Sequence, residues 1–442
     1  MIRTVCLLIL ICPTVLFAQQ KTRDDKVRED RAKVESEGFW IYNDLAKGLT
    51  EAKQTGKPLL VVLRCIPCEE CVKLDDDLVD QDPAIQQLLQ KFVCVRQVST
   101  NGLDLATFQY DTDQSFAVFM LNADGTIYGR FGTRSHRTEW FGDVSLTGMA
   151  KALQGALELH ADYPHNKESL AGKRGPKPLY PSPEKFPSLK DKYTDSLNYS
   201  GNVVRSCIHC HQIGDARRDY YRSRNTPMPQ RLIFPYPHPK SVGLILDPKE
   251  KATITKIVPD SPADRSGFRS GDEILTLDNQ PLLSMADVQW VLEQAPPAGG
   301  NVSAVVLRDG KRVNLTLELA AGWRRADDIS WRVSSWGYRR MATGGMLLAA
   351  LPAEERQEAG LTNPKQMALK VEHLGQYGAH AAAKKAGFKK GDVLVEFDGR
   401  TNLLREADLF ERGLTKLKPG DKVRVTVLRD GKRVDLKLPM QL

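Results

Sequence analysis

The sequence has neither a long apolar run nor a block of charge of one sign. The apolar run from Val5 to Phe17 is shorter than the about 20 residues that a membrane-spanning helix needs, and the composition excludes a polytopic membrane protein. The 63 Lys and Arg and the 55 Asp and Glu give a charge of +8 that is scattered in both signs, which does not indicate a nucleic-acid partner. With 41% hydrophobic residues, the 442-residue chain is expected to form about three globular domains.

The N-terminus is typical of a secretory signal peptide. Arg3 precedes the apolar run, which closes with Leu16-Phe17-Ala18 before polar residues. Cleavage after Ala18 makes residues 1–18 the signal peptide and predicts an exported protein, periplasmic or extracellular, with no membrane span left after cleavage. An uncleaved anchor is the alternative. The cysteines beyond the signal are expected to mature in a compartment that permits disulfides.

Proline divides the mature chain into blocks. Residues 164–187 form a Pro- and Lys-rich linker, which we expect to hold neither a helix nor a central strand. A second proline cluster runs from Pro227 to Pro239. These boundaries predict an N-terminal domain of residues 37–163, a short, mostly irregular or helical segment of residues 188–239, and a C-terminal region from residue 240 onward.

The C-terminal region is a duplication. The sequence Val-Leu-Arg-Asp-Gly-Lys-Arg-Val occurs at 306–313 and again at 427–434, and Gly-Asp at 271–272 recurs at 391–392. In each copy an Asp-Gly pair, which accepts positive φ, predicts a β-hairpin that closes the unit. Ala286 to Gln294 is predicted to be helical.

The order of motifs in each copy resembles the PDZ fold of bacterial secreted proteins. In the first copy Ser261-Pro262-Ala263 is followed by Gly-Asp and then Arg-Asp-Gly; in the second, Ala381-Ala382-Ala383 replaces Ser-Pro-Ala. The resemblance assigns α+β PDZ-like domains to residues 240–320 and 342–442. PDZ domains bind extended peptides, usually C-termini, by adding a strand to a sheet edge and holding the carboxylate on loop amides.

This resemblance implies that protein or peptide C-termini are the partners. It places the peptide-binding loops at Gly243, Leu244, Ile245, Leu246, Gly345, Met346, Leu347 and Leu348. The alternative is that these domains only pack against the rest of the chain. Neither Gly-x-Ser-x-Gly nor Gly-Asn-Ser-Gly-Gly occurs, so the sequence does not support a serine protease.

A Trp- and Arg-rich connector, residues 321–341, joins the two copies. Its aromatic residues are Trp323, Trp331, Trp336 and Tyr338, interleaved with arginines. Aromatic side chains at such spacing usually pack domains together, and we prefer that interpretation to a nucleic-acid surface.

The N-terminal block places three cysteines directly after a buried strand. Asn43 and Asp44 precede a predicted helix, and the apolar run from Leu59 to Leu63 predicts the strand. Cys65, Cys68 and Cys71 follow. The chain then predicts a helix from Asp82-Pro83, strands at 92–98 and 116–121, and a last helix from Ser145, which is an α/β order.

This block resembles the thioredoxin superfamily. The family's spacing, counted from Lys57-Pro58, makes Cys68 the attacking and Cys71 the resolving cysteine, with Cys65 and Cys94 as accessory thiols. A pair separated by two residues at a helix N-terminus suits disulfide exchange, because helix amides stabilise the attacking thiolate. Phe116 stands where the family has a cis-proline. A structural disulfide, or a thiolate site for copper or zinc, is the alternative.

Cys207-Ile208-His209-Cys210-His211 has the spacing of a c-type haem attachment site. There, Cys207 and Cys210 form thioethers to the haem and His211 is the proximal iron ligand. Met228 is the expected sixth ligand, with His238 as the other candidate. A zinc site, or a disulfide with no cofactor, is the alternative.

These features predict an α/β thioredoxin-like domain, a CxxCH segment carrying haem c, and two α+β PDZ-like domains. We expect a thiol-redox or electron-transfer protein whose PDZ-like domains dock a partner peptide. The candidate enzyme activity is that of a thiol-disulfide oxidoreductase. The alternative is a non-enzymatic PDZ scaffold with a catalytically degenerate thioredoxin-like domain. Phe116 favours the scaffold, and the Cys68/Cys71 pair beside CxxCH favours redox chemistry.

Overall fold

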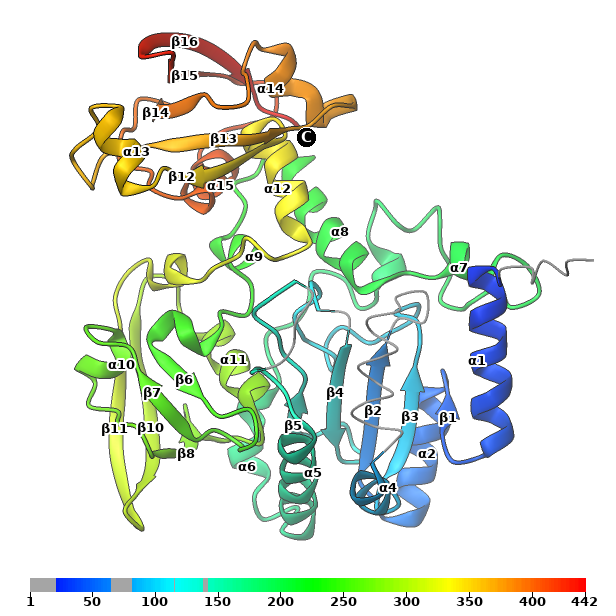
Figure 1. Ribbon diagram of the computed structural model, residues 1–442. Coiled ribbons are helices and arrows are strands. Elements are labelled where there is room, and N and C mark those ends of the chain that lie inside the picture. Colours follow the sequence, from blue (N-terminus) through cyan, green and yellow to red (C-terminus); the bar gives the residue numbers. More distant parts are fainter. Residues whose placement is uncertain (1–20, 65–81, 115, 138–141) are drawn as a thin grey trace, which may run out of the picture.

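The computed structural model describes residues 21–64, 82–114, 116–137 and 142–442, and within them three sheet-containing domains follow one another along the chain (Figure 1). The N-terminal domain has a five-stranded sheet in the order β1-β3-β2-β4-β5. The first repeat domain has a four-stranded sheet, β11-β10-β8-β9, and the two-stranded sheet β6-β7. The second repeat domain has a five-stranded sheet, β12-β13-β14-β15-β16. Within these ranges no helix combines the length and apolar character that crossing a membrane requires.

The sheet of the N-terminal domain is buried on both faces. Its central strands β2 and β3 are parallel, and β4 runs antiparallel to β2. Every residue of β2 is buried, which explains the apolar run from Leu59 to Leu63. The strands are β1 (Ile41–Tyr42), β2 (Leu59–Arg64), β3 (Val93–Gln97), β4 (Phe116–Leu121) and β5 (Ile127–Phe131).

The helices of this domain begin at the capping residues that the sequence indicates. Asp44 accepts a hydrogen bond from Lys47 N and starts α2 (Leu45–Thr55). Asp82 caps α4 (Pro83–Leu89), with the proline in the first turn, and Ser145 caps α5 (Leu146–Ala161). The predicted helices are therefore confirmed.

A further helix, α1 (Arg23–Glu37), was not predicted. A capping box at Thr22 begins it, and only Val27 and Val34 are buried. These two valines join the hydrophobic cluster that contains Trp40. Because the rest of the helix is polar, its apolar stripe is too narrow to recognise in the sequence.

The Pro-rich linker holds short helical turns, so the expectation that 164–187 holds no helix is wrong. These turns are α6 (Lys167–Leu170) and the 3₁₀ turns η2 (Ala171–Lys173) and η3 (Pro183–Lys185). Single turns fit between the prolines, and a proline in the first turn is compatible with η3. The segment from 188 to 242 continues with α7 (Val203–Ser206), α8 (Cys210–Arg222), α9 (Gln230–Ile233) and η4 (Pro239–Val242).

The two repeat domains share their local structure. Asp309-Gly310 and Asp430-Gly431 have positive φ and form the two predicted hairpin turns. Arg308 pairs with Asp272, and Arg429 pairs with Asp392, each at 2.7 Å. The duplication therefore extends from the sequence to individual ion pairs.

The elements of the first repeat domain are β6 (Leu244–Leu246), β7 (Ile254–Ile257), α10 (Pro262–Arg265), β8 (Glu273–Leu277), β9 (Gln280–Pro281), α11 (Met285–Gln294), β10 (Gly300–Arg308) and β11 (Lys311–Leu319), followed by η5 (Trp323–Ala326). Those of the second are α12 (Ser334–Thr343), β12 (Met346–Ala350), α13 (Ala353–Glu358), β13 (Leu369–Leu374), η6 (Gly378–Ala381), α14 (Ala382–Lys385), β14 (Val393–Phe397), α15 (Glu406–Thr415), β15 (Lys422–Arg429) and β16 (Lys432–Pro439).

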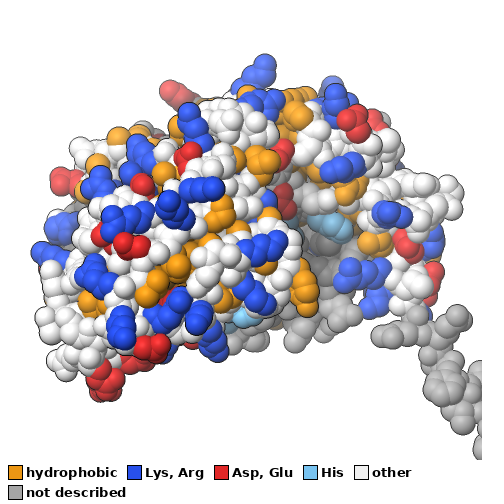
Figure 2. All heavy atoms as spheres, turned by 90° about the horizontal axis from the view of Figure 1, so that it is seen from above, with side chains coloured by type: hydrophobic (Ala, Val, Ile, Leu, Met, Phe, Trp, Pro, Cys, Tyr) orange, Lys and Arg blue, Asp and Glu red, His pale blue; other side chains and the backbone are white. Residues whose placement is uncertain are grey.

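Each repeat domain packs against a different part of the chain. In the first, α11 lies beside β5 of the N-terminal domain, whereas the second contacts α8 through α12 and α9 through α15 (Figure 1). Viewed from the end formed by the second repeat domain, basic and acidic side chains are intermixed over the surface (Figure 2). This mixing agrees with the scattered charge of the sequence.

Candidate functional site

The CxxCH loop lies between two helices and is fastened to the N-terminal domain. Helix α7 ends at Ser206 and α8 begins at Cys210. Thr100 donates to the Ile208 carbonyl oxygen from both its N, at 3.2 Å, and its Oγ1, at 2.7 Å. Ile208 N donates to Asn101 Oδ1 at 2.7 Å. Because Thr100 and Asn101 follow β3, these bonds hold the loop near the end of that strand, on the edge where β2 also ends.

The two thiols of the loop are buried and are not joined in a disulfide. Tyr110 Oη donates to Cys210 Sγ at 3.0 Å. Burial raises the pKa of Cys207 to about 11 and also raises the pKa of Cys210. Both sulfurs are therefore protonated at neutral pH in this packing.

His211 is oriented by a backbone carbonyl. Its Nδ1 lies 3.1 Å from the Thr112 oxygen. A carbonyl accepts from a protonated Nδ1, so this contact favours the tautomer in which Nε2 carries a lone pair. The same arrangement is common for histidines that bind a metal through Nε2, so His211 fits the role of proximal haem ligand in this respect.

The structure does not bring the two candidate sixth ligands to His211. Met228 is buried in a cluster with Phe234, Tyr338 and Phe410, and its N donates to the Leu414 oxygen. His211 lies in the first turn of α8 whereas Met228 follows the end of that helix, whose 13 residues span about 20 Å. His238 Nε2 lies 3.2 Å from the buried Asp143 carboxylate.

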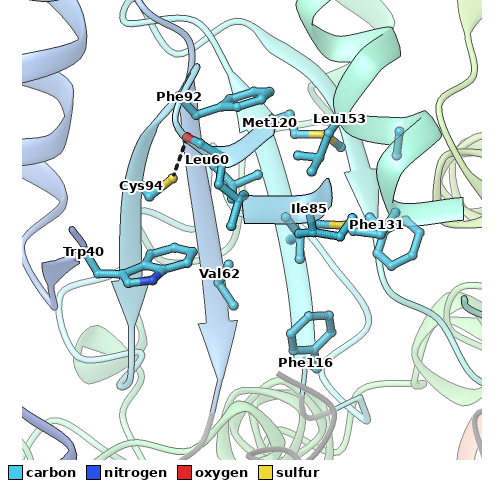
Figure 3. Close-up of a cluster of buried hydrophobic side chains, with 14 of the residues drawn as sticks. Trp40, Leu60, Val62, Ile85, Phe92, Cys94, Phe116, Met120, Phe131 and Leu153 are labelled. Carbon is cyan, nitrogen blue, oxygen red and sulfur yellow. Dashed lines mark hydrogen bonds between the residues drawn. The ribbon is translucent and has the colours of Figure 1, made fainter. Parts of the chain in front are cut away.

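The accessory thiol Cys94 lies within the hydrophobic core. Its side chain packs near Trp40 and Phe92, and its Sγ donates to the Leu89 oxygen at 3.5 Å (Figure 3). Burial raises its pKa well above the ordinary value. Cys65, Cys68 and Cys71 lie outside the described residues. The register pairs Phe116 with Arg64, the last described residue before those cysteines.

The side chains predicted to bind peptide mostly face the domain cores. Leu244 and Leu246 are buried in the first repeat domain, and Met346 and Leu348 in the second, as strand alternation requires. Leu347 instead reaches the surface. Gly243 N donates to the Lys240 oxygen at 3.0 Å, and Gly345 N donates to the Arg339 oxygen at 2.8 Å. Both glycines have positive φ. Ile245 is half-buried.

A buried charge cluster joins all three domains and was not predicted. Arg332 is almost fully buried and donates to Asp111 at 2.6 Å, with Asp113 at 3.6 Å and Asp327 at 3.7 Å. Asp111 and Asp113 belong to the N-terminal domain, and Ser334 of α12 donates to Asp113 at 2.6 Å. Burial raises the pKa of Asp111 to about 6 and that of Asp327 to about 7.

Helix α11 is buried along most of its length, between the core of its own domain on one side and the N-terminal domain with the linker on the other. Asp287 lies 3.1 Å from the buried Lys173 ammonium and accepts from Arg130 N at 3.2 Å. Trp290 Nε1 donates to the Gly172 oxygen at 3.0 Å, and the Arg130 guanidinium lies 3.8 Å from the Trp290 ring. These bonds fix the first repeat domain to its neighbour.

Family models match the three domains. A thioredoxin-like model matches residues 40–123, and a PDZ domain model matches 237–319 and 378–440. The chain contains a thioredoxin-like domain and two PDZ domains. The first predicted peptide-binding loop, 243–246, lies within the matched residues, and the second, 345–348, precedes its matched range. Among the described residues, no group of three or more His, Cys, Asp or Glu is arranged to hold a metal ion.

Part of this chain is similar to bacterial proteins named as periplasmic serine endoproteases. A probable periplasmic serine endoprotease DegP-like of Marinomonas sp. (strain MWYL1) is 27% identical over 186 residues, which are 42% of this chain and 36% of that protein. Periplasmic serine endoprotease DegP of Escherichia coli (strain K12) is 34% identical over 150 residues, 34% of this chain and 27% of that protein. This chain thus matches about a third of each relative's length.

Solved structures show a more distant likeness. The structure titled HtrA-type protease AlgW with decapeptide is 16% identical, with a TM-score of 0.20, and the match covers 32% of this chain and 48% of that one. The serine endoprotease from Yersinia pestis is 25% identical, with a TM-score of 0.15, and the match covers 16% of this chain and 26% of that one.

Proposed function

We propose that this protein is an exported, periplasmic redox protein that acts at the edge of its thioredoxin-like sheet and holds a partner through a PDZ domain. One observation carries this proposal: Ile208 of the CxxCH loop is hydrogen-bonded to Thr100 and Asn101 at that edge. The same edge leads from Arg64 into the predicted Cys68/Cys71 pair. The CxxCH loop is thus attached to the edge at which β2 ends, and in the sequence Cys68 and Cys71 follow soon after the end of that strand.

The periplasm is proposed from two independent observations. The sequence predicts a signal peptide over residues 1–18. In addition, the relatives similar to this chain are named as periplasmic serine endoproteases. Both c-type haem attachment and disulfide exchange are compatible with such a compartment.

Haem c is the cofactor that we propose for the loop. Cys207 and Cys210 would hold it and His211 would be its iron ligand; when bound, the group supplies one-electron transfer. The Thr112 carbonyl keeps the His211 ring in one orientation and one tautomer. Because Met228 and His238 are engaged elsewhere, we propose no sixth ligand from these two residues. Because both thiols are buried, haem would have to be attached before the loop reaches its final packing, or the loop would have to open.

Mass spectrometry of the protein, exported in cells with a c-type maturation system, tests the haem proposal. We expect the mass of one haem to be added, and Cys207→Ala with Cys210→Ala to abolish the addition. Cys94→Ala is the control, because Cys94 is equally buried but lies outside the motif. An unmodified mass in the wild-type protein, together with stoichiometric zinc, would exclude haem at this site.

Thiol redox chemistry is the second activity that we propose for the same edge, with Cys68 as the attacking thiol. We expect the full chain to reduce insulin disulfides, and Cys68→Ser to abolish this activity because the resolving Cys71 alone has no attacking partner. Cys94→Ser again serves as the control. Activity that survives in Cys68→Ser would assign the chemistry to other thiols.

A non-enzymatic scaffold is a second candidate function, and one observation favours it. The first PDZ domain is fixed by the buried Lys173–Asp287 pair and by Trp290, which is expected of a domain that serves a structural role. Absence of both haem and insulin reduction, together with retained peptide binding, would establish the scaffold.

A further inference from the structure

In the second PDZ domain, strand β12 and helix α15 mark the place where a peptide is expected to dock. Among the described strands, β12 is at the edge of its sheet, and a peptide that adds a strand would pair with this edge. Helix α15 borders the same edge, because Glu406 in its first turn accepts from Leu348 N at 2.9 Å. The space between β12 and α15 is therefore where peptide docking is expected.

The main-chain groups that line the start of this groove are already bonded. The loop amide Gly345 N donates to the Arg339 oxygen of α12 at 2.8 Å. The Met346 oxygen accepts from Thr343 Oγ1 of α12 at 2.9 Å. Leu348 N is the group that binds Glu406. An incoming peptide C-terminus has to replace these three contacts.

Side chains of α12 fill the groove as well. Tyr338 and Ala342 belong to one buried cluster with Phe410 and Leu414 of α15, and the ring centroids of Tyr338 and Phe410 are 5.6 Å apart. Arg339 donates to both carboxylate oxygens of Glu406, at 2.9 and 2.8 Å.

We propose that α12 is an intramolecular occupant of the second PDZ groove, and that a peptide C-terminus binds there only when α12 leaves. This inference rests on the peptide docking in the proposed function. The helix is joined to β12 through Gly344 and Gly345, with φ of 62° and 87°, a pair of residues at which the chain can change direction. The occupant and the carboxylate loop are therefore adjacent in sequence, and displacing one exposes the other.

The first PDZ domain differs in this respect. When the two copies are aligned, Gln289 of α11 stands at the position that Phe410 has in α15. Its Nε2 donates to the Tyr236 oxygen at 3.2 Å, and its Oε1 accepts from Thr133 of the thioredoxin-like domain. The corresponding helix face is therefore held by another domain, and we assign the displaceable occupant to the second PDZ domain alone.

Gly413 offers a substitution that disfavours the occupant. It lies on α15, and a Cβ there would meet Ala342 Cβ at 2.8 Å and Ala342 Cα at 3.2 Å. Gly413→Ala strengthens α15 as a helix but forces α12 outward. We expect it to tighten peptide binding at least about fivefold, because less of the binding energy is used to displace α12.

Gly337 offers the matched substitution in the opposite direction. It lies within α12, and a Cβ there meets nothing closer than Met341 Cε at 3.9 Å. Gly337→Ala favours the helical, docked state of α12, so we expect peptide binding to weaken about fivefold. Both changes are Gly to Ala in a helix, so a general gain in stability cannot produce opposite effects.

Fluorescence anisotropy measures the affinity of the full chain for a labelled decapeptide that ends in Val, with a free or an amidated C-terminus. Hydrogen exchange of residues 334–343 measures the departure of α12. We expect the affinity for the peptide to change in opposite directions in the two variants. We also expect the amidated peptide to lose binding, and the amide hydrogens of α12 to exchange faster when the peptide binds. Equal affinities in both variants, or binding with unchanged exchange, would overturn it. If Gly413→Ala accelerates the exchange of α12 and yet no peptide binds to any variant, the docking function itself is wrong at this groove.

Discussion

At the scale of single residues, the least expected feature is the imbalance of charge around Arg332. Asp111, Asp113 and Asp327 share this guanidinium, and Arg218 contributes a second positive charge near Asp113. Burial disfavours the ionised form of each carboxylate, and mutual repulsion between Asp111 and Asp327 adds to that penalty. The pKa values of Asp111 and Asp327 are raised as a result, so the stability of the junction depends on pH.

Asp327→Asn is expected to stabilise the protein at high pH. The pKa of Asp327 rises from 3.8 to about 7 on folding, so folding takes up a proton between these values and stability falls as the pH rises through this window. Asparagine keeps an oxygen for His238 N, which donates to Asp327 Oδ1 at 3.1 Å, and carries no charge. We expect a gain of at least about 1 kcal/mol at pH 8 and a smaller one at pH 4.5, measured by denaturant unfolding.

The exposed neighbour supplies the control for this prediction. Asp328→Asn removes the charge of the next residue, which is exposed and therefore screened by solvent. We expect it to change the pH dependence of the free energy of unfolding little. Parallel pH profiles for Asp327→Asn and the wild-type protein would show that Asp327 is ionised throughout the range.

At the scale of elements, close contact between α5 and the first PDZ domain depends on one glycine. The Pro248 oxygen lies at the first turn of α5, where Ser145 Oγ donates to it at 2.8 Å. A carbonyl oxygen is favoured there by the partial positive charge of a helix N-terminus. A Cβ at Gly148 would lie 2.2 Å from that oxygen, so the approach requires glycine.

Gly148→Ala is therefore expected to destabilise the chain by about 1–3 kcal/mol, although alanine is the better helix former. The physical reason is that Pro248 contributes a backbone atom, which can move only with its loop. Thermal unfolding measures the loss, and limited proteolysis near residues 247–251 reports detachment of that loop. Gly337→Ala, at an uncrowded helix position, should show no loss. Equal melting temperatures for Gly148→Ala and the wild-type protein would refute the contact.

The elements also show what the sequence can predict. Strand β2, helix α5 and the two Asp-Gly hairpins follow from local patterns of apolar and capping residues. Helix α12 was missed because the Trp and Arg content of the connector was interpreted as packing alone. Its buried residues Tyr338, Met341 and Ala342 nevertheless have helical spacing, so a signal was present.

At the scale of the whole molecule, the contacts between domains are those that no local pattern predicts. Arg332 and Asp111 are 221 residues apart, and neither belongs to a motif. The same holds for the pair of Lys173, in a proline-rich linker, with Asp287. Local sequence thus indicates the three domains and the CxxCH motif, whereas the buried charges that join the domains become visible only when the chain is folded.

Helix α8 fixes a distance within the molecule. Its first turn carries His211, which contacts the thioredoxin-like domain at Thr112, and its last residue, Arg222, donates to the Leu417 and Gln441 oxygens of the second PDZ domain at 2.9 and 2.7 Å. A helix of this length is a stiff rod, about 20 Å long, attached at both ends. Because α8 is attached at both ends, we expect a rotation of the second PDZ domain to displace the CxxCH loop as well.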